Sequence, residues 1–342
     1  MHMYEILEKL TDKAGISGFE DDIAVFLENT LNKFCDEVRI DDARCVTGII
    51  RSGKVNAKKI MLEAHLDRIG LIVSEIHDNG FVSFSTIGGI DKRILPASEV
   101  LILGKSKVYG VVGAKPPHLI TSSDSKALKI EDMTIDTGIQ YDELRKKISV
   151  GDPILITSPL RKLLGNIVSS PALDNRAGIA AILHCLEKID KSRLAYDIYI
   201  SFTSGEESGL HGAYTLHRND APDLAVIVDV THGSTHDKND YTTFPLGSGP
   251  VICRGPSLHH DMTKEVINLL EKNNLPYNIE IASGNSGTNA WAFQTQHGGI
   301  PCVLVSIPLR YMHTTVETVD LNDISATTDL LAKIIYGGVS LA

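Results

Sequence analysis

The chain has 342 residues, of which 43% are hydrophobic and 22% charged, a composition typical of a globular protein of one to three domains. A net charge of −10 argues against nucleic acid or an anionic membrane as partner, and no apolar stretch approaches the roughly 18 residues of a membrane span. Five scattered cysteines without a C-x-x-C pair argue against a disulfide framework or thiolate zinc site and predict a reducing, cytoplasmic location.

The N-terminal part predicts two helices followed by two strands. Residues Met3 to Ala14 form the first predicted helix, and Ser17-Gly18-Phe19-Glu20 has the form of a capping box for the second. Strands are predicted at 46–51 and 59–63. The second strand leads into His65 and Asp67, whose side chains share one face because side chains alternate along a strand. A carboxylate beside a histidine suits a partner that orients the imidazole for metal binding, although His-x-Asp alone more often marks a packed or surface histidine.

The pattern of hydrophobic and turn-forming residues changes between residues 68 and 167. Short β-prone runs alternate there with turns, at 71–76, 81–86, 99–103, 108–112 and 153–157. Because helical periodicity is scarce, this segment predicts a small all-β domain, with residues 126–132 as a loop. It is inserted into an α/β domain formed by residues 1–67 and 168–342.

After Ala172 the α/β pattern resumes and carries most of the acidic candidates. Asp174 precedes a helical run at 179–186, a strand at 198–203 leads to Glu206 and Glu207, and Asp229 nearly ends an apolar strand at 223–230. A helix at 261–272, a strand at 301–307 before His313 and a closing helix at 322–336 complete the prediction. Acidic side chains at the C-terminal ends of strands lie where open α/β sheets place their chemistry.

Two histidines and several carboxylates therefore follow different strands of one domain. A two-metal hydrolytic site needs such a set: a bridging carboxylate, one histidine and one carboxylate for each ion, and a free carboxylate as base. Each member also has a structural interpretation. Asp174 suits a helix N-cap and Glu206-Glu207 a solvated pair, whereas Asp229 is costly in an apolar strand unless it is paired or binds metal.

The sequence resembles the tetrahedral (TET) dinuclear metallo-aminopeptidases, also called glutamyl aminopeptidases or endoglucanase-like peptidases. Seven motifs carry the resemblance in one order along nearly the whole chain: His65-Leu66-Asp67, Gly113-Ala114-Lys115-Pro116-Pro117-His118, Ile135-Asp136-Thr137-Gly138, Leu173-Asp174-Asn175-Arg176-Ala177-Gly178, Glu206-Glu207-Ser208-Gly209-Leu210, Val228-Asp229-Val230-Thr231-His232 and Arg310-Tyr311-Met312-His313.

The resemblance implies a role for each candidate. His65 and Asp229 would hold one metal ion, Glu207 and His313 the other, and Asp174 would bridge them. Glu206 would be the general base and Asp67 would orient His65. The two divalent ions would be zinc or cobalt, with manganese also suited to nitrogen and oxygen ligands. The family also implies a zinc-peptidase-like mixed sheet flanked by helices, a PDZ-like or barrel insertion, peptide substrates, and homo-oligomers from dimers to tetrahedral dodecamers.

Three positions depart from the family pattern, and several polar residues are weaker candidates. Arg68 stands where an acid is common, His211 where arginine is common, and Asn289 where the family has aspartate. Substrate contacts are predicted for His232, Arg310 and Asn289. Metal binding by His236 is disfavoured because residues 231–240 predict a loop, and His118, His259 and His260 are predicted to be structural or exposed.

Three classes of function stay open from the sequence. A metal-dependent aminopeptidase accounts for the whole residue set. A glycoside hydrolase would use two carboxylates flanking a sugar without metal, for which the adjacent Glu206 and Glu207 are poorly placed. A catalytically inactive scaffold would leave the intact ligand set without a purpose. The preferred N-terminal residue is not readable from the pattern.

Overall fold

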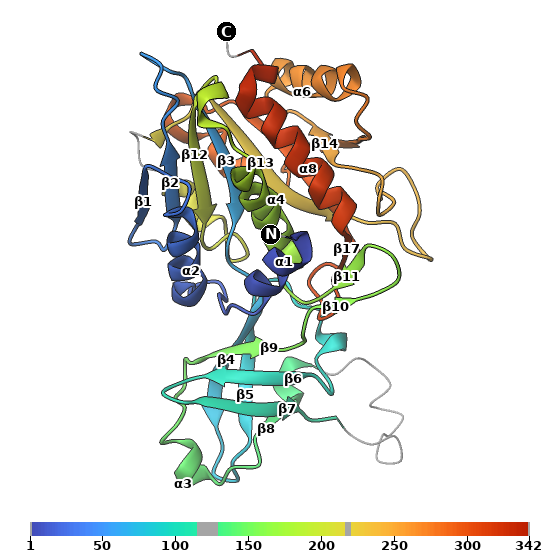
Figure 1. The fold of residues 1–342 in the computed structure, drawn as a ribbon. Coiled ribbons are helices and arrows are strands. Elements are labelled where there is room, and N and C mark those ends of the chain that lie inside the picture. Colours follow the sequence, from blue (N-terminus) through green and yellow to red (C-terminus); the bar gives the residue numbers. More distant parts are fainter. Residues whose placement is uncertain (1, 115–128, 216–219, 341–342) are drawn as a thin grey trace.

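The computed structural model describes residues 2–114, 129–215 and 220–340. An α/β domain and a smaller β-barrel lie one above the other, joined where the chain enters and leaves the barrel (Figure 1). No helix within the described ranges combines the length and hydrophobicity needed to cross a bilayer.

The α/β domain is built on an eight-stranded mixed sheet in the order β1-β2-β12-β3-β13-β16-β14-β15. The strands are β1 (Glu37–Ile40), β2 (Val46–Ile50), β12 (Asp197–Thr203), β3 (Lys59–His65), β13 (Leu224–His232), β16 (Cys302–Leu309), β14 (Val251–Arg254) and β15 (Asn278–Ile281). The central four, β12, β3, β13 and β16, are parallel, and Thr203 pairs with His65 in register. Their C-terminal ends therefore meet at one edge of the sheet.

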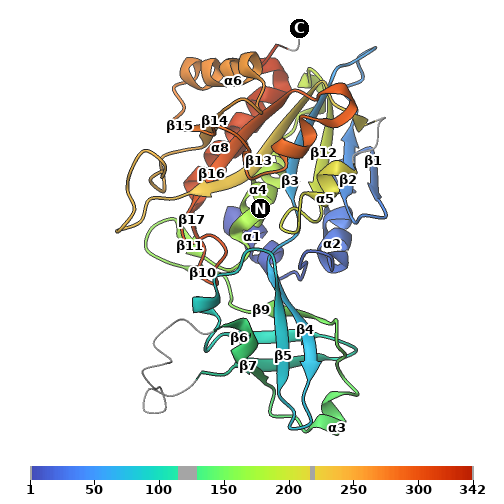
Figure 2. The ribbon, with the colours of Figure 1, turned by 180° about the vertical axis from the view of Figure 1, so that it is seen from behind.

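Helices cover both faces of this sheet. On one face lie α1 (Met3–Thr11), α2 (Asp21–Leu31), α4 (Leu173–Glu187) and α8 (Leu321–Lys333), with α6 (His260–Lys272) near the end where β14 lies (Figure 1). The other face carries the short helices α5 (His211–Tyr214) and α7 (Ala290–Phe293), and α5 is labelled in Figure 2. Because apolar side chains of the strands point to both faces, the sheet is buried between two hydrophobic layers.

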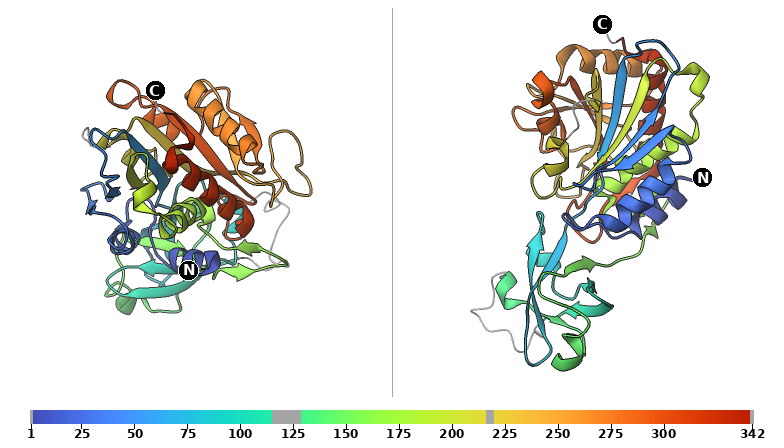
Figure 3. Two further views of the ribbon diagram at one scale, coloured as in Figure 1. Left: turned by 45° about the horizontal axis from the view of Figure 1, so that its top comes forward. Right: turned by 90° about the vertical axis from the view of Figure 1, so that its left-hand side faces the viewer.

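The inserted segment forms a closed antiparallel barrel in the order β4-β5-β8-β7-β6-β9. Its strands are β4 (Gly70–Ile76), β5 (Val82–Ile87), β8 (Ile135–Asp136), β7 (Lys107–Val112), β6 (Glu99–Leu103) and β9 (Pro153–Ile156), and α3 (Tyr141–Leu144) lies between β8 and β9. Figure 3 shows the barrel projecting from the α/β domain. The predicted fold class, an α/β domain with an inserted all-β barrel, is confirmed.

A small three-stranded sheet, β10-β11-β17, connects the segment that follows the barrel with the C-terminal part of the chain. It pairs β10 (Arg161–Lys162) and β11 (Ile167–Ser169) with β17 (Thr318–Asp320), far away in sequence. The predicted domain boundary between residues 167 and 168 falls within β11. The domain boundaries at 67/68 and 167/168 stay a prediction.

Several local predictions differ from the structure. The capping box is wrong: Glu20 precedes α2 without a side-chain cap and accepts a hydrogen bond from the Gly18 N–H at 2.8 Å, while the Ser17 hydroxyl bonds the Ser208 hydroxyl at 2.7 Å. The first helix ends at Thr11 rather than at residue 14. The closing helix leaves α geometry at Ile334, where a π turn begins and runs to Gly338.

Two more local predictions concern loops. Thr231 and His232 belong to β13 rather than to a loop, because their backbone continues the parallel pairing with β16. Of the predicted 126–132 loop, Ile130–Asp132 forms a 3₁₀ turn and residues 126–128 lie outside the described residues. His118 and most of the 113–118 motif also lie outside them.

Burial of the central strands predicts a sharp contrast between two leucines. Leu62 on β3 is fully buried, whereas Leu164 is 93% exposed. Leu62→Ala should lower the free energy of unfolding by about 2–5 kcal/mol, because it removes core contacts and leaves a cavity. Leu164→Ala should change it by less than about 0.5 kcal/mol. Urea denaturation of both variants checks this, and equal midpoints would contradict the described packing.

Candidate metal centre

Five side chains meet at the C-terminal edge of the parallel strands. His65 ends β3, Asp229 lies near the end of β13, and Glu207 follows β12 by four residues. Asp174 lies at the start of α4, and His313 follows β16. These are the five residues predicted as metal ligands, and the fold brings them into two adjoining groups.

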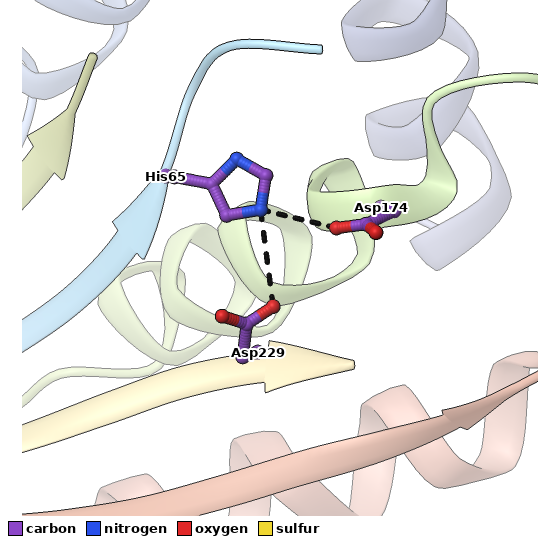
Figure 4. Close-up of side chains that lie close together, drawn as sticks. All are labelled: His65, Asp174 and Asp229. Atoms are coloured by element: carbon purple, nitrogen blue, oxygen red, sulfur yellow. Dashed lines mark hydrogen bonds and ion pairs between the residues drawn. The ribbon is translucent and has the colours of Figure 1, made fainter. Parts of the chain in front are cut away.

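The first group comprises His65, Asp174 and Asp229 (Figure 4). The Nε2 atom of His65 lies 3.0 Å from Oδ1 of Asp174 and 3.8 Å from Oδ1 of Asp229. One donor atom of each residue lies within 4.8 Å of the others, and all three side chains are buried. One histidine nitrogen with two carboxylate oxygens is a donor set suited to a divalent ion such as zinc.

The second group comprises Asp174, Glu207 and His313. The Nε2 atom of His313 lies 3.4 Å from Oδ2 of Asp174 and 3.3 Å from Oε2 of Glu207. Asp174 therefore directs one carboxylate oxygen to each group. It is not a helix N-cap: Ala172 occupies that position, and Asp174 and Asn175 have non-helical backbone angles inside the first turn.

Both histidines are held through their other ring nitrogen. Nδ1 of His65 lies 3.2 Å from the Asp67 carbonyl oxygen and 3.5 Å from its carboxylate. Nδ1 of His313 donates to the carbonyl of Gly89, in the barrel, at 3.0 Å. These contacts leave each Nε2 directed at the carboxylates, which is the arrangement that metal-binding histidines need.

Asp67 also holds the loop that carries the two glutamates. Its carboxylate accepts hydrogen bonds from the backbone N–H groups of Glu206 at 3.0 Å and Glu207 at 3.1 Å. One fully buried side chain thus contacts His65 and positions the segment after β12.

Glu317 is a supporting residue that the sequence analysis missed. Its carboxylate accepts from the backbone N–H of Asp174 at 3.0 Å and from that of His313 at 2.8 Å. Asn175, whose peptide bond to Asp174 is cis, donates from Nδ2 to the Val228 carbonyl at 2.8 Å. No sequence signal pointed to Glu317, because the contact with Asp174 spans 143 positions.

The crowded carboxylates shift one another's proton affinity. Burial, together with the charges of Asp229, Asp174 and Glu207, raises the pKa of Glu206 to about 9. Burial and the charge of Asp174 raise the pKa of Glu207 to about 8, and the same two causes raise that of Asp229 to about 7. Burying several ionised carboxylates together costs free energy unless cations lie beside them. The donor set therefore fits divalent metal ions.

Two buried arginines lie close to this acidic centre. Arg68, a departure from the family pattern, donates from Nη2 to the Ile156 carbonyl at 3.3 Å, and burial lowers its pKa to about 10. Its charge acts on Glu317 and Glu207. Arg176 is fully buried, and its charge acts on Asp67 and Glu20. The substitution at 68 therefore adds a buried cation near the acids without removing any predicted ligand.

A cavity of about 210 Å³ opens over both groups. It is lined by the five predicted ligands and Glu206, together with Val230, Thr231, His232, Glu280, Ser286, Gly287, Thr288, Leu304, Ser306 and Met312. A larger cavity, of about 530 Å³, lies beside β1, β2 and β12 but contains neither group. The chemistry therefore favours the smaller cavity as the candidate site.

The three predicted substrate contacts take different positions. His232 lines the cavity. Arg310 does not line it and donates from Nε to the Ser234 carbonyl at 2.5 Å. Asn289 is 1% exposed, and its Nδ2 donates to Glu63 and to Thr203, both at 2.8 Å, so the side chain supports the core behind the cavity.

The remaining described histidines lie outside both ligand groups. His211 and His236 are exposed and belong to neither group. His259 has a structural role, because its Nδ1 caps α6 by accepting from the Met262 N–H at 3.3 Å, and His260 is exposed.

Comparison with known proteins gives consistent matches over almost the whole chain. Residues 46–330 match the model of the M42 glutamyl aminopeptidase family. A putative aminopeptidase of Acetivibrio thermocellus is 33% identical over 97% of this chain and 98% of its own, and a lysyl aminopeptidase of Pyrococcus furiosus is 29% identical over 96% and 95%. The TET1 peptidase of Pyrococcus horikoshii, described as assembling into a tetrahedron or a large octahedral shell, superposes with a TM-score of 0.87 at 29% identity, covering 98% and 100%.

The raised pKa values predict that metal binding releases protons. The pKa of Glu207 is about 8, and the hydrogen bond with Asp174 is the main cause that raises the pKa of His313 to about 9. At pH 7 and without metal, both side chains are therefore protonated. A divalent ion binds only their deprotonated forms, so affinity should rise from pH 6 to 8, about tenfold per pH unit for each proton released. Titration calorimetry in two buffers of different ionisation enthalpy measures this release. Equal heats in both buffers would contradict it.

The contact from the barrel predicts an effect of Gly89 on metal binding. A Cβ atom at Gly89 would lie 3.1 Å from Nδ1 of His313, so Gly89→Ala should displace the imidazole and weaken zinc binding by about tenfold or more. Gly284→Ala is the matched control, because a Cβ there meets no atom within 4 Å. Zinc competition with a chromogenic chelator compares them. Parental affinity in Gly89→Ala would show that this contact does not hold His313.

Proposed function

The chain belongs to the M42 glutamyl aminopeptidase family, and on this premise we propose that it removes N-terminal residues from peptides with a pair of divalent metal ions and Glu206 as general base. The family resemblance predicted from the motifs is confirmed, and the protein is a hydrolase of the metallo-aminopeptidase class. The observation that most supports the proposal is Asp174, which directs one oxygen to each of two His-carboxylate groups.

His65 and Asp229 would hold one ion, Glu207 and His313 the other, and Asp174 both. When bound, such ions polarise the scissile carbonyl and make a water molecule nucleophilic near neutral pH. Zinc, cobalt and manganese all suit this donor set.

Glu206 is the carboxylate of this loop that belongs to neither ligand group, although it lines the same cavity. It would take a proton from the attacking water at its carboxylate oxygen and deliver it to the nitrogen of the leaving amine. The backbone N–H of Glu206 is bonded to Asp67, so the base is positioned by the residue that also orients His65. Burial raises its proton affinity, and bound cations would lower it toward the working pH.

The glycoside hydrolase alternative remains a useful contrast. A glycosidase needs no metal and places two carboxylates on either side of a sugar. Here Glu207 lies against His313 and Asp174, which fits ligation better than it fits a free catalytic acid.

Location and assembly belong to the proposal as well. We infer a homo-oligomer, because the matched Pyrococcus horikoshii peptidase assembles into closed shells and the chain covers it completely. The barrel is the proposed oligomer contact and would also control substrate access. A cytoplasmic location is proposed from the five free cysteines.

Replacement of the proposed base tests the mechanism. Glu206→Gln should lower kcat on leucyl-p-nitroanilide by about 10²–10⁴-fold, because it removes the proton acceptor, with the metal content unchanged. Glu8→Gln, at an exposed position of α1, is the matched control and should match the parent protein. Elemental analysis and steady-state kinetics with and without chelator provide the readout. Turnover untouched in Glu206→Gln, or activity on carboxymethylcellulose that survives chelation, would overturn the proposal.

A further inference from the structure

Glu280 is a carboxylate in the candidate cavity that the mechanism does not use. It lies on β15, the edge strand of the large sheet, and its side chain is half-buried. All the other acidic residues lining the cavity belong to the two ligand groups or are Glu206. Neither lysine nor arginine is found among the described lining residues.

A hydrogen bond fixes the Glu280 carboxylate beside the metal groups. Its Oε1 atom accepts from the hydroxyl of Thr231 at 3.0 Å. Thr231 follows Asp229 by two positions on β13, so both side chains lie on the same face of that strand. The carboxylate is thus tied to the neighbour of a predicted ligand and lines the same cavity.

Within the described part of the chain, Glu280 forms no ion pair with a lysine or an arginine. The charge of His232 acts on its carboxylate, and Cys253 lies opposite it on β14. A partly desolvated carboxylate gains most from a cation that arrives with the ligand. The apolar lining residues Leu304 and Met312 can cover the methylene stem of a lysine or arginine side chain.

We propose that Glu280 determines substrate specificity by selecting peptides whose N-terminal side chain is a cation, lysine or arginine. This inference rests on the proposed function. A substrate with N-terminal glutamate is disfavoured, because Glu280 would repel its side-chain charge. The cavity that Glu280 lines has a volume of about 210 Å³ and also contains both ligand groups.

The test compares kcat/KM on lysyl-, leucyl- and glutamyl-p-nitroanilides. The parent protein should favour lysine over leucine, and glutamate should be poorest. Glu280→Gln should lower the lysine-to-leucine ratio by about tenfold, mainly through a higher KM for the lysyl substrate, because the lost pairing stabilises ground state and transition state alike. Glu280→Lys should reverse the order of the lysyl and glutamyl substrates. Glu271→Gln, exposed on α6, is the matched control and should keep the parental ratio.

The outcomes separate this inference from the proposed function. A parent protein that hydrolyses leucyl-p-nitroanilide, with a lysine-to-leucine ratio that Glu280→Gln leaves unchanged, overturns the inference and leaves the aminopeptidase mechanism standing. Absence of metal-dependent turnover on every substrate overturns both. Metal content and thermal unfolding of each variant show that an altered ratio does not come from a damaged site.

Discussion

The structure depends on the need of buried carboxylates for positive charge. Asp67, Asp174 and Asp229 are all at least nine-tenths buried, and Glu207 lies beside them. An isolated ionised carboxylate at such a site is unfavourable by several kcal/mol. Two histidines and two buried arginines lie close to these carboxylates. Two bound cations would neutralise the negative charge that remains. The raised pKa values of Glu206 and Glu207 have the same cause, because without metal too little positive charge lies near them.

The barrel contributes to this centre as well as projecting from it. The carbonyl of Gly89 holds His313, and a Cβ at the neighbouring Gly88 would lie 3.4 Å from Oε2 of Glu207. A Cβ at Gly89 would therefore crowd His313, whereas one at Gly88 would clash with Cγ2 of Ile69 at 2.7 Å and meet Glu207 only at ordinary contact distance. Because the chain enters the barrel directly after Asp67 and Arg68, the two parts of the molecule share one boundary at the active edge of the sheet.

Much of the fold was predictable because its long elements have strong periodicity. The central strands and the helices α6 and α8 were predicted to within about three residues, whereas α4 begins at Leu173, well before the predicted start at residue 179. Short or polar strands were missed, among them β14, β15 and β17, since a strand of three or four residues carries too little pattern to distinguish it from loop. The predicted capping box at Ser17 and Glu20 is wrong because the Ser17 hydroxyl bonds that of Ser208, 191 positions away, instead of capping α2.

The candidate ligands could be named from sequence because each follows a strand or opens a helix, and parallel strands end at a common edge. Periodicity alone did not give their grouping, which came from the family resemblance, since it depends on β12, β3, β13 and β16 lying side by side in that order. The same holds for Glu317, Gly89 and Glu280, whose contacts join segments between 49 and 224 positions apart. Local periodicity encodes which face a side chain takes along its own element. Which distant element lies opposite is decided by packing of the whole sheet, and only the tertiary structure shows it.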